Sequence, residues 1–459
     1  MADSFQTTDP ATGATLQKFK HLSSAQIETI LSEAHSEYLK AKTKTVSLKS
    51  DQLKKLAQGF RKHQKDLAKI MTLEMGKPLK DSLSEIEKCA VTCEYFAENL
   101  SKFLSGEDVK ANYAKSEIVK DSIGPILAVM PWNFPVWQVI RFAAPAVGIG
   151  NPILLKHADL TAGSAEKIVE IFDEVAPGLM YNMRIDHDQA AEVIADRRVS
   201  AVTLTGSARA GREIAQVAGK NLKKAVLELG GSDAYVVFAD SDVEKSAEIC
   251  AKARMVNNGQ SCVAAKRFIV EKSVLPKFLE QFNKTLQSMK IGDPLNEETA
   301  VGSLAAKKFQ EQLIQQCAQL EKAGGEKLLD LAGKTGFESP PDGAFFPARV
   351  YKVSKKTEMA FTEEFFGPVA LVFEFSSEDE ALEIANKSIY GLGGAVFSKD
   401  IDRAKKFARL MEAGFIAIND SVKSDAHLPF GGVKDSGYGR ELSHYGFNEF
   451  CNIKTLGIG

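Results

Sequence analysis

From Tyr113 onward the sequence alternates short apolar runs with helical stretches, and this alternation constrains the fold more than any other feature. The runs "GPILAVMPWNFP", "NPILLKHADLT" and "VSAVTLTGS" are typical of buried strands. The stretches "AGSAEKIVEIFDEVA" and "ARAGREIAQVAGKNL" have the periodicity of the helices that connect such strands. Because strands that alternate with helices favour a parallel sheet covered on both faces, we expect a doubly wound α/β fold.

The alternation begins again near Gly230, through "KRFIVEK", "GPVALVFEFSS", "GLGGAVFS" and "AGFIAIND". A chain of 459 residues is too long for a single hydrophobic core. The restart therefore predicts a second α/β domain, packed against the first with a cleft between them. Ahead of both, the segment from Ser23 to Leu104 has helical periodicity and predicts amphipathic helices.

Composition excludes several classes of function. A formal net charge of -2 gives no reason to expect nucleic acid or an anionic membrane as a partner. No window approaches the roughly 20 apolar residues of a membrane span, and the N-terminus lacks the pattern of a secretory signal. The cysteines show neither a disulfide framework nor the spacing of a metal site, so we expect a cytoplasmic protein without a metal. They are Cys89, Cys93, Cys250, Cys262, Cys317 and Cys451.

The segment "TLTGSARAGREIAQ" has two interpretations. Gly206 and Ser207 form a turn after a β-rich run, and Gly211 lies in the first turn of a helix, whose N-terminal amides attract an anion such as a dinucleotide pyrophosphate. The alternative is a plain strand-to-helix turn, because the usual GxGxxG fingerprint is absent. Asp159, three residues after Lys156, either suits the hydroxyls of a ribose or forms a solvated charge pair.

By residue type alone, Cys262 in "NNGQSCVAAK" is either a core residue or a nucleophile. No histidine adjoins it in a Cys-His-Asn arrangement, as a protease would require. Other segments supply different partners: Glu228 in "LELGGSDAYVVF", Asn133 in "MPWNFPVW", and both Glu364 and Phe366 in "EEFFGPVALV". A thiol, a carboxylate base, an amide donor and a dinucleotide loop together favour oxidation of an aldehyde through a thioester.

These segments resemble the NAD(P)-dependent aldehyde dehydrogenase superfamily. "PWNFP", "TGSARAG", "LELGG", "GQSC", "EEFFGPV" and "PFGGVKDSGYGREL" stand in the order of that family over nearly the whole chain. "WNFPVWQVIR", "LLKHA" and "ELSHYG" are most similar to its succinate-semialdehyde dehydrogenase branch. The resemblance implies two Rossmann-like domains with a small β oligomerisation arm, and a homodimer or homotetramer. It places the dinucleotide-binding domain at 1–101 and 123–229, the catalytic domain at 230–422, and the arm at 102–122 and 440–459.

The resemblance also implies roles. Cys262 attacks the aldehyde, Asn133 and the Cys262 backbone N–H hold the oxyanion, and Glu228 activates the water that hydrolyses the thioester. An acid at the position of Asp159 favours NAD, with NADP as the alternative. The positions that correspond to cofactor-binding residues are Trp132, Lys156, Asp159, Gly206, Ser207, Gly211, Leu229, Gly230, Glu364 and Phe366.

For the substrate, the resemblance places Arg141 where the branch holds the carboxylate of succinate semialdehyde, with Ser421 as a further contact. The branch carries a second Arg where this chain has Val256. A broad-specificity aliphatic or hydroxy-aldehyde dehydrogenase is therefore the alternative. A non-catalytic relative would have lost Cys262, and a CoA-acylating relative would lack Glu228, so both are less favoured.

Overall fold

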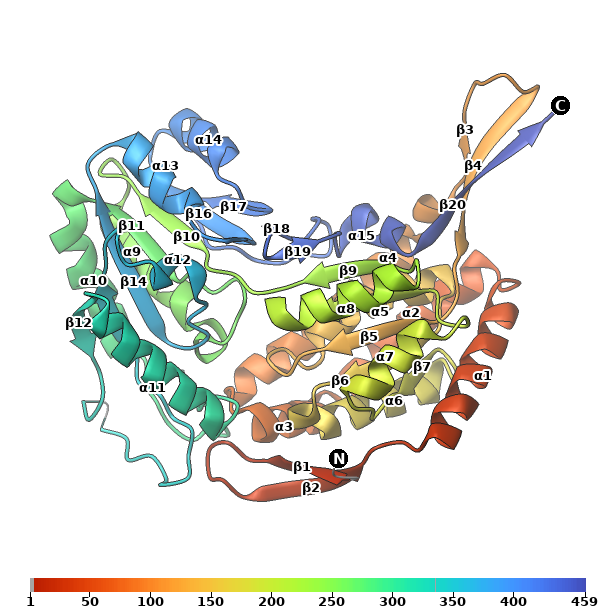
Figure 1. Cartoon of the computed structure of the whole chain (residues 1–459), viewed down its shortest axis with the longest axis horizontal. Coiled ribbons are helices and arrows are strands. Elements are labelled where there is room, and N and C mark those ends of the chain that lie inside the picture. The colour runs from red at the N-terminus through yellow and green to blue at the C-terminus, as the bar shows by residue number, and fades with distance from the viewer. Residues whose placement is uncertain (1–3, 335) are drawn as a thin grey trace.

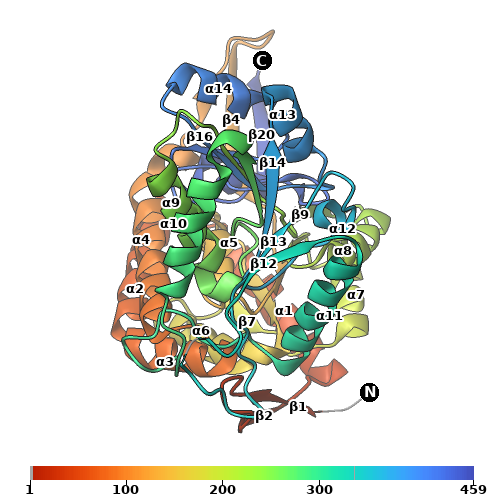
Figure 2. The ribbon, with the colours of Figure 1, turned by 90° about the vertical axis from the view of Figure 1, so that its left-hand side faces the viewer.

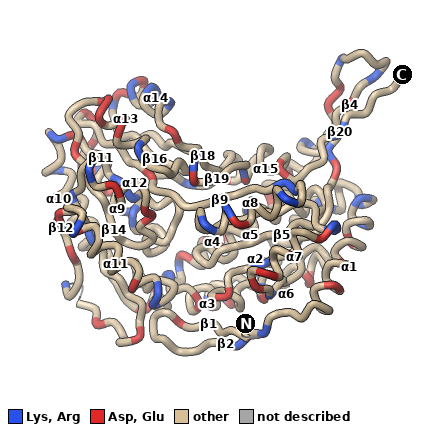
Figure 3. Tube along the Cα trace, viewed as in Figure 1, with Lys and Arg blue, Asp and Glu red and all other residues tan. Residues whose placement is uncertain are grey.

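The computed structural model describes residues 4–334 and 336–459, and two sheets lie side by side in it (Figure 1). Four helices of the N-terminal third pack around the first sheet, in agreement with the periodicity of that segment. They are α1 (Ser24–Ala41), α2 (Val46–Lys62), α3 (Gln64–Met75) and α4 (Leu79–Leu104). Lys and Arg are interspersed with Asp and Glu along the whole trace (Figure 3). Within the described residues, no helix is long and apolar enough to cross a membrane.

The first sheet has six strands in the order β19-β9-β8-β5-β6-β7, parallel except for the edge strand β19. The strands are β5 (Ile126–Met130), β6 (Ile153–His157), β7 (Met180–Asn182), β8 (Ala201–Thr205), β9 (Lys224–Glu228) and β19 (Gly437–Tyr438). The connecting helices are α5 (Trp137–Ile149), α6 (Ala162–Val175), α7 (His187–Ala195) and α8 (Ala208–Lys220).

Both faces of this sheet are covered, as a doubly wound fold requires. Along β5, Ile126 and Ala128 pack among α2 to α6, whereas Leu127 packs on the other face with α1 and α7. Because successive strand residues point to opposite faces, a strand buried on both sides reads as a continuous apolar run. The runs that predicted β5, β6 and β8 are of this kind.

The second sheet has seven strands in the order β12-β13-β14-β11-β10-β16-β17, parallel except for the edge strand β12. The strands are β10 (Ala234–Val237), β11 (Arg267–Glu271), β12 (Glu326–Asp330), β13 (Arg349–Lys352), β14 (Val369–Phe375), β16 (Gly393–Phe397) and β17 (Phe415–Ile418). One face carries α9 (Val243–Met255) and α10 (Leu275–Gln287). The other carries α11 (Lys307–Lys322), α12 (Met359–Thr362), α13 (Glu378–Asn386) and α14 (Ile401–Leu410), so that Figure 2 shows the sheet between two helical layers.

Besides these two sheets, the described residues form three smaller ones, of which one is the short antiparallel pair of β15 (Tyr390–Gly391) and β18 (Val433–Lys434). A hairpin of β1 (Ser4–Thr8) and β2 (Thr15–Lys20) runs beneath both halves of the molecule, and a three-stranded arm projects from the side of the first sheet (Figure 1). The arm consists of β3 (Glu107–Asp108), β4 (Lys115–Ser122) and the C-terminal β20 (Cys451–Ile458), with β20 antiparallel to β4. The exact division of the chain into domains stays a prediction.

The remaining short helix is α15 (Ser443–Glu449). Three 3-10 turns lie at Asp159–Thr161, Val256–Gly259 and Lys272–Val274. The antiparallel pairing of β19 with β9 places Gly437 beside Glu228 and returns the last part of the chain to the first sheet.

Candidate active site

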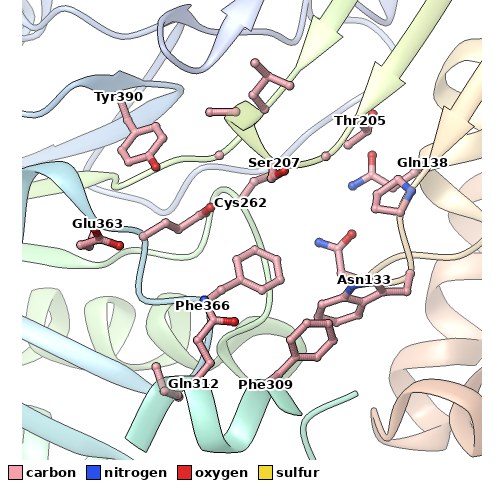
Figure 4. Close-up of a pocket in the computed structure, with 18 of the residues that line it drawn as sticks. Asn133, Gln138, Thr205, Ser207, Cys262, Phe309, Gln312, Glu363, Phe366 and Tyr390 are labelled. Carbon is pink, nitrogen blue, oxygen red and sulfur yellow. The ribbon is translucent and has the colours of Figure 1, made fainter. Parts of the chain in front are cut away.

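Two cavities meet at Cys262. The smaller cavity, of about 350 Å³, is lined among others by Asn133, Thr205 and Phe366. The larger cavity, of about 730 Å³, is lined among others by Arg141 and Ser421. Cys262 is half-buried and lines both. In Figure 4 the side chains labelled around the smaller cavity come from loops, strand ends and helices of both halves of the molecule, with Phe309 and Gln312 on α11.

The loop before Cys262 has an unusual backbone that other segments hold in place. Asn257, Asn258 and Gly259 all have positive φ, at 55°, 58° and 78°. Asn tolerates this left-handed region better than most residues, and Gly enters it freely. The Asn258 Nδ2 donates to the carbonyls of Gly76, at 3.1 Å, and Ser303, at 2.8 Å. The buried hydrogen bonds therefore fix the turn that presents Cys262.

Asn133 is fixed against the same loop. Its Nδ2 donates to the carbonyl of Gln260 at 3.0 Å, and its own carbonyl accepts from Nδ2 of Asn257 at 2.6 Å. An amide nitrogen carries two N–H groups, so this bond leaves Asn133 a second donor. The structure thus brings the predicted amide donor and Cys262 to the lining of one cavity.

Burial and the neighbouring charges act on the pKa of Cys262 in opposite directions. Burial raises the pKa of the thiol to about 12, whereas the positive charges of Arg141 and Lys266 act to lower it. Lys266 is fully buried, and its Nζ donates to the carbonyls of Ser261 and Cys262, both at 2.7 Å. With this raised pKa the thiol of Cys262 is protonated at neutral pH, so a reaction at its sulfur requires removal of that proton.

Glu228 ends strand β9 and is buried. Burial raises the pKa of its carboxyl well above the ordinary value, and the neighbouring Glu441 adds to the rise. Among the described residues neither oxygen of the Glu228 carboxylate has a hydrogen-bond partner. Glu228 does not belong to the lining of either cavity. Gly431 makes room for it, because a Cβ there would lie 2.7 Å from Oε1 of Glu228.

Arg141, on helix α5, forms a buried ion pair. Its Nε lies 2.7 Å from Oε2 of Glu441, and the two side chains are 1% and 2% exposed. The guanidinium also lies 4.7 Å from the ring centre of Phe430 and donates to Oγ1 of Thr205 at 3.4 Å. Arg141 lines the larger cavity, but its charge is balanced within the protein.

The strand-to-helix turn after β8 faces the smaller cavity. Gly206 and Ser207 line it, and Ser207 caps α8 by accepting from the Ala210 N–H at 3.3 Å. Gly211 does not reach the lining; a Cβ there would lie 2.6 Å from Cδ1 of Leu229, so this glycine lets α8 pack closely on β9. Leu229 itself lines the cavity.

On the opposite wall, Glu364 is tied to the Gly230–Gly231 pair. Its Oε1 accepts from the Gly231 N–H at 3.0 Å and lies 3.3 Å from Nζ of Lys266. A Cβ at Gly230 would lie 2.6 Å from Oε2 of Glu364. The missing side chain at Gly230 therefore keeps this part of the cavity open.

Of the remaining predicted positions, Trp132 and Ser421 line a cavity, whereas Lys156 and Asp159 do not. Trp132 lines the smaller cavity, with its ring stacked 4.7 Å from Phe309 and edge-on to Phe366 at 5.6 Å. Lys156 and Asp159 lie outside its lining, and Lys156 Nζ is 3.5 Å from Oδ1 of Asp159. Ser421 lies at the larger cavity, where its backbone N–H donates to Oδ1 of Asp420 at 2.7 Å.

Several residues that shape the site were not predicted from the sequence. Glu441 lies within the distinctive segment "PFGGVKDSGYGREL", so its position among the motifs was the available signal. Lys266 follows Cys262 by four positions. Phe309, on α11, and Lys88, on α4, belong to ordinary amphipathic helices, and no sequence signal marks them.

Comparison with known proteins identifies the family. The model of the "Aldehyde dehydrogenase family" matches residues 1–456. The chain belongs to this family. An aldehyde dehydrogenase oxidises aldehydes with NAD(P), which agrees with the chemistry predicted from the sequence.

Three relatives of this aldehyde dehydrogenase cover nearly its full length. It is 37% identical over 450 residues to a succinate semialdehyde dehydrogenase of Escherichia coli (strain K12), named for NAD(P)+, with 98% of this chain and 96% of the relative covered. It is 38% identical over 461 residues to a succinate-semialdehyde dehydrogenase of Mycobacterium avium, named for NADP(+), with 99% and 96% covered. The crystal structure of succinic semialdehyde dehydrogenase from Streptococcus pyogenes with NADP+ matches it with a TM-score of 0.94 at 36% identity, over 99% of each chain. The predicted aldehyde dehydrogenase fold and the resemblance to this branch are confirmed.

Proposed function

We propose that this aldehyde dehydrogenase oxidises succinate semialdehyde to succinate, with Cys262 as the nucleophile. The observation that carries the proposal is the position of Cys262 between two cavities of different character. The smaller suits a dinucleotide, and the larger holds cationic side chains among apolar ones. Relatives of this branch are named for the same substrate.

The smaller cavity has features that fit NAD(P). The helix α8 begins beside Gly206 and Ser207, and amides at a helix N-terminus favour a phosphate. The open backbone at Gly230 and the carboxylate of Glu364 provide room and an acceptor for a ribose hydroxyl. In this assignment Trp132 and Phe366 form the aromatic wall, Leu229 contacts the cofactor, and Gly211 acts through the packing of α8.

For the first half of the reaction, Cys262 loses its thiol proton to water, the thiolate Sγ attacks the aldehyde carbon, and the carbonyl oxygen becomes an oxyanion. The free N–H of Asn133 and the backbone N–H of Cys262 donate to that oxyanion. NAD(P), when bound in the smaller cavity, would supply the acceptor for the hydride and a positive charge that favours the thiolate of Cys262. A thioester between Cys262 and the acyl group results.

For the second half, Glu228 takes a proton from the water that attacks the thioester. The carboxylic acid leaves, and the Cys262 thiol is restored. Because burial raises the pKa of Glu228, the carboxylate form that acts as base becomes more abundant as pH rises. Hydrolysis of the thioester is therefore expected to accelerate with pH, which a pre-steady-state measurement of acyl-enzyme decay tests.

We propose NAD as the preferred cofactor. The carboxylate of Asp159 suits ribose hydroxyls and repels a 2′-phosphate. It also lies 3.5 Å from Nζ of Lys156 and so offsets the cation that would otherwise attract that phosphate. Because some relatives are named for NADP(+), the cofactor preference of this chain directly tests the role assigned to Asp159.

The test is formation of reduced cofactor by the purified protein, with NAD and NADP each crossed with succinate semialdehyde, glutarate semialdehyde and butanal. We expect kcat/KM to be highest for the carboxylated aldehydes with NAD. The variant Cys262→Ala should show no oxidation of any of the three. Equal kcat/KM for butanal and succinate semialdehyde would refute the substrate assignment and leave the chemistry standing.

One observation favours the second candidate, a broad-specificity aliphatic or hydroxy-aldehyde dehydrogenase. The charge of Arg141 is balanced by Glu441, so Arg141 attracts the carboxylate of a substrate less strongly than an unpaired guanidinium would. In this function Arg141 braces the cavity wall and does not select the substrate. Equal kcat/KM in the same assay would support it.

We also propose that the arm of β4 and β20 joins copies of the chain into a homodimer or homotetramer. Ile453 and Ile458 on β20 are 58% and 57% exposed, and an apolar edge strand invites pairing with another strand. Light scattering of the full chain and of a chain that ends at residue 450 compares their masses. An unchanged mass after truncation would refute this role of the arm.

A further inference from the structure

The larger cavity contains a second cation besides Arg141. Lys88 projects from helix α4 into its lining, which also includes Trp137, Ser421 and Ser424. The side chain of Lys88 is half-buried, its Nζ lies 4.0 Å from the ring centre of Trp137, and it donates to Oγ of Ser424 at 2.8 Å. The ammonium is therefore held at a defined place within the cavity that contains Cys262.

The two carboxylates that act on the charge of Lys88, those of Glu85 and Asp425, are engaged elsewhere, and a third acid of the same cavity, Asp81, lies outside ion-pair distance of it. Glu85, one turn earlier on α4, accepts from the backbone N–H groups of Val136 and Trp137 and pairs with Lys77. Asp425 accepts from Nδ1 of His427 at 2.7 Å. Among the described residues, no carboxylate oxygen lies within ion-pair distance of Nζ of Lys88.

The other cations of this lining differ from Lys88. Arg141 is paired with Glu441, Lys252 with Glu248 and Lys423 with Asp420. Lys80, Lys252 and Lys423 are exposed, so that solvent screens their charges. Lys88 thus differs from these cations in being both half-buried and without an acidic partner among the described residues.

Such a group carries a free-energy penalty that an anion would relieve. Burial lowers the pKa of Lys88 to about 8, with Arg141 on α5 acting in the same direction. Cys89 and Glu85 on α4 and Asp425 in the loop after β17 act in the opposite direction. A carboxylate that enters the cavity supplies the missing partner and strengthens the charged form of Lys88.

We propose that Lys88, with the hydroxyl of Ser424 beside it and that of Ser421 in the same cavity lining, binds the carboxylate of short aldehydes that carry an acid at the far end. Lys88 is the residue that selects these substrates, while Arg141 remains in its ion pair with Glu441. This inference rests on the proposed function and names the cation that gives it specificity. The binding residue lies on α4, outside the segments that carry the reacting groups.

The test compares Lys88→Met with Lys88→Arg, which keeps the charge, and with Lys102→Met, which removes an exposed lysine near the end of the same helix. For Lys88→Met we expect KM for succinate semialdehyde to rise about 10- to 100-fold, the value of one charge-assisted hydrogen bond. KM for butanal should stay within about twofold, and Lys88→Arg should recover most of the loss. Lys102→Met should behave as wild type.

The outcomes separate the two proposals. If wild type prefers succinate semialdehyde and Lys88→Met keeps that preference, the role of Lys88 is refuted while the proposed function stands. If KM rises equally for butanal, Lys88 shapes the cavity without recognising charge, and the inference is again refuted. If wild type shows no preference, the proposed function is refuted; failure of succinate to compete with butanal would then refute the binding role of Lys88 as well.

Discussion

Replacing Glu441 with Gln removes the carboxylate that faces Arg141 and leaves the guanidinium buried. Both side chains are almost inaccessible, at 1% and 2% exposed, and Nε lies 2.7 Å from Oε2. Loss of one partner of such a pair costs about 3 to 5 kcal/mol of stability, because the other charge stays buried without compensation. Arg141 keeps its contacts with Phe430 and Thr205, so we expect a loss at the lower end, about 3 kcal/mol.

Urea unfolding of Glu441→Gln and wild type measures this loss. The chain has two tryptophans, Trp132 and Trp137, and both lie at the cavities, so their fluorescence reports on this region. Both proteins are compared at one concentration, because assembly contributes to apparent stability. The matched control is Glu449→Gln, whose partner Lys224 is 48% exposed, and for which we expect a loss under about 1 kcal/mol.

The variant also changes the charges that act on Glu228. Glu441 raises the pKa of Glu228, so its removal should lower that pKa and move the rise of thioester hydrolysis to lower pH. A loss of stability no larger than that of Glu449→Gln would refute the argument that Glu441 compensates a buried charge. An unshifted pH profile would refute the electrostatic link between the two acids.

Three further predictions test single steps. Asn133→Ala should lower kcat about 100- to 1,000-fold, with cofactor affinity unchanged by fluorescence titration, because one oxyanion donor is lost; a smaller loss would move that role elsewhere. Asp159→Ser should raise kcat/KM for NADP relative to NAD roughly fivefold, by removing about 1 kcal/mol of screened repulsion and freeing Lys156, and an unchanged ratio would contradict this. The ratio of kcat/KM for succinate semialdehyde to kcat/KM for butanal should fall as pH rises through about 8, because Lys88 loses its charge there. In Lys88→Met the same ratio should not change with pH. Titration of Cys262 affects both substrates equally and therefore cancels in the ratio.

The sequence predicted the parts of the fold in which burial leaves a simple pattern. Strands covered on both faces are continuous apolar runs, so β5, β6 and β8 were found, and the restart near Gly230 precedes β10 at Ala234. The helix α5 was not predicted, because all of its residues are buried and Pro145 lies within it, which leaves no polar face to reveal a helical period. The hairpin of β1 and β2 was also missed, since five of the six residues of β2 are exposed and polar residues predominate there.

The candidate site was predictable where a residue stands in a distinctive segment. Cys262 and Asn133 were proposed in that way, and the structure brings them to one cavity. Lys88 has no such surroundings, because it is one of three lysines on an ordinary amphipathic helix. Its distinction arises only when α4 packs against Trp137 and Ser424, far from it along the chain.

The meeting of the two cavities at Cys262 has a kinetic consequence. A ligand in the smaller cavity and one in the larger lie against the same sulfur from separate cavities, so we expect that neither has to leave before the other binds. Initial rates measured over both concentrations should give intersecting reciprocal plots, and the acid product should inhibit in competition with the aldehyde alone. In the mechanism that we propose, reduced cofactor would then leave while the acyl group still awaits water, which separates the release of the two products in time.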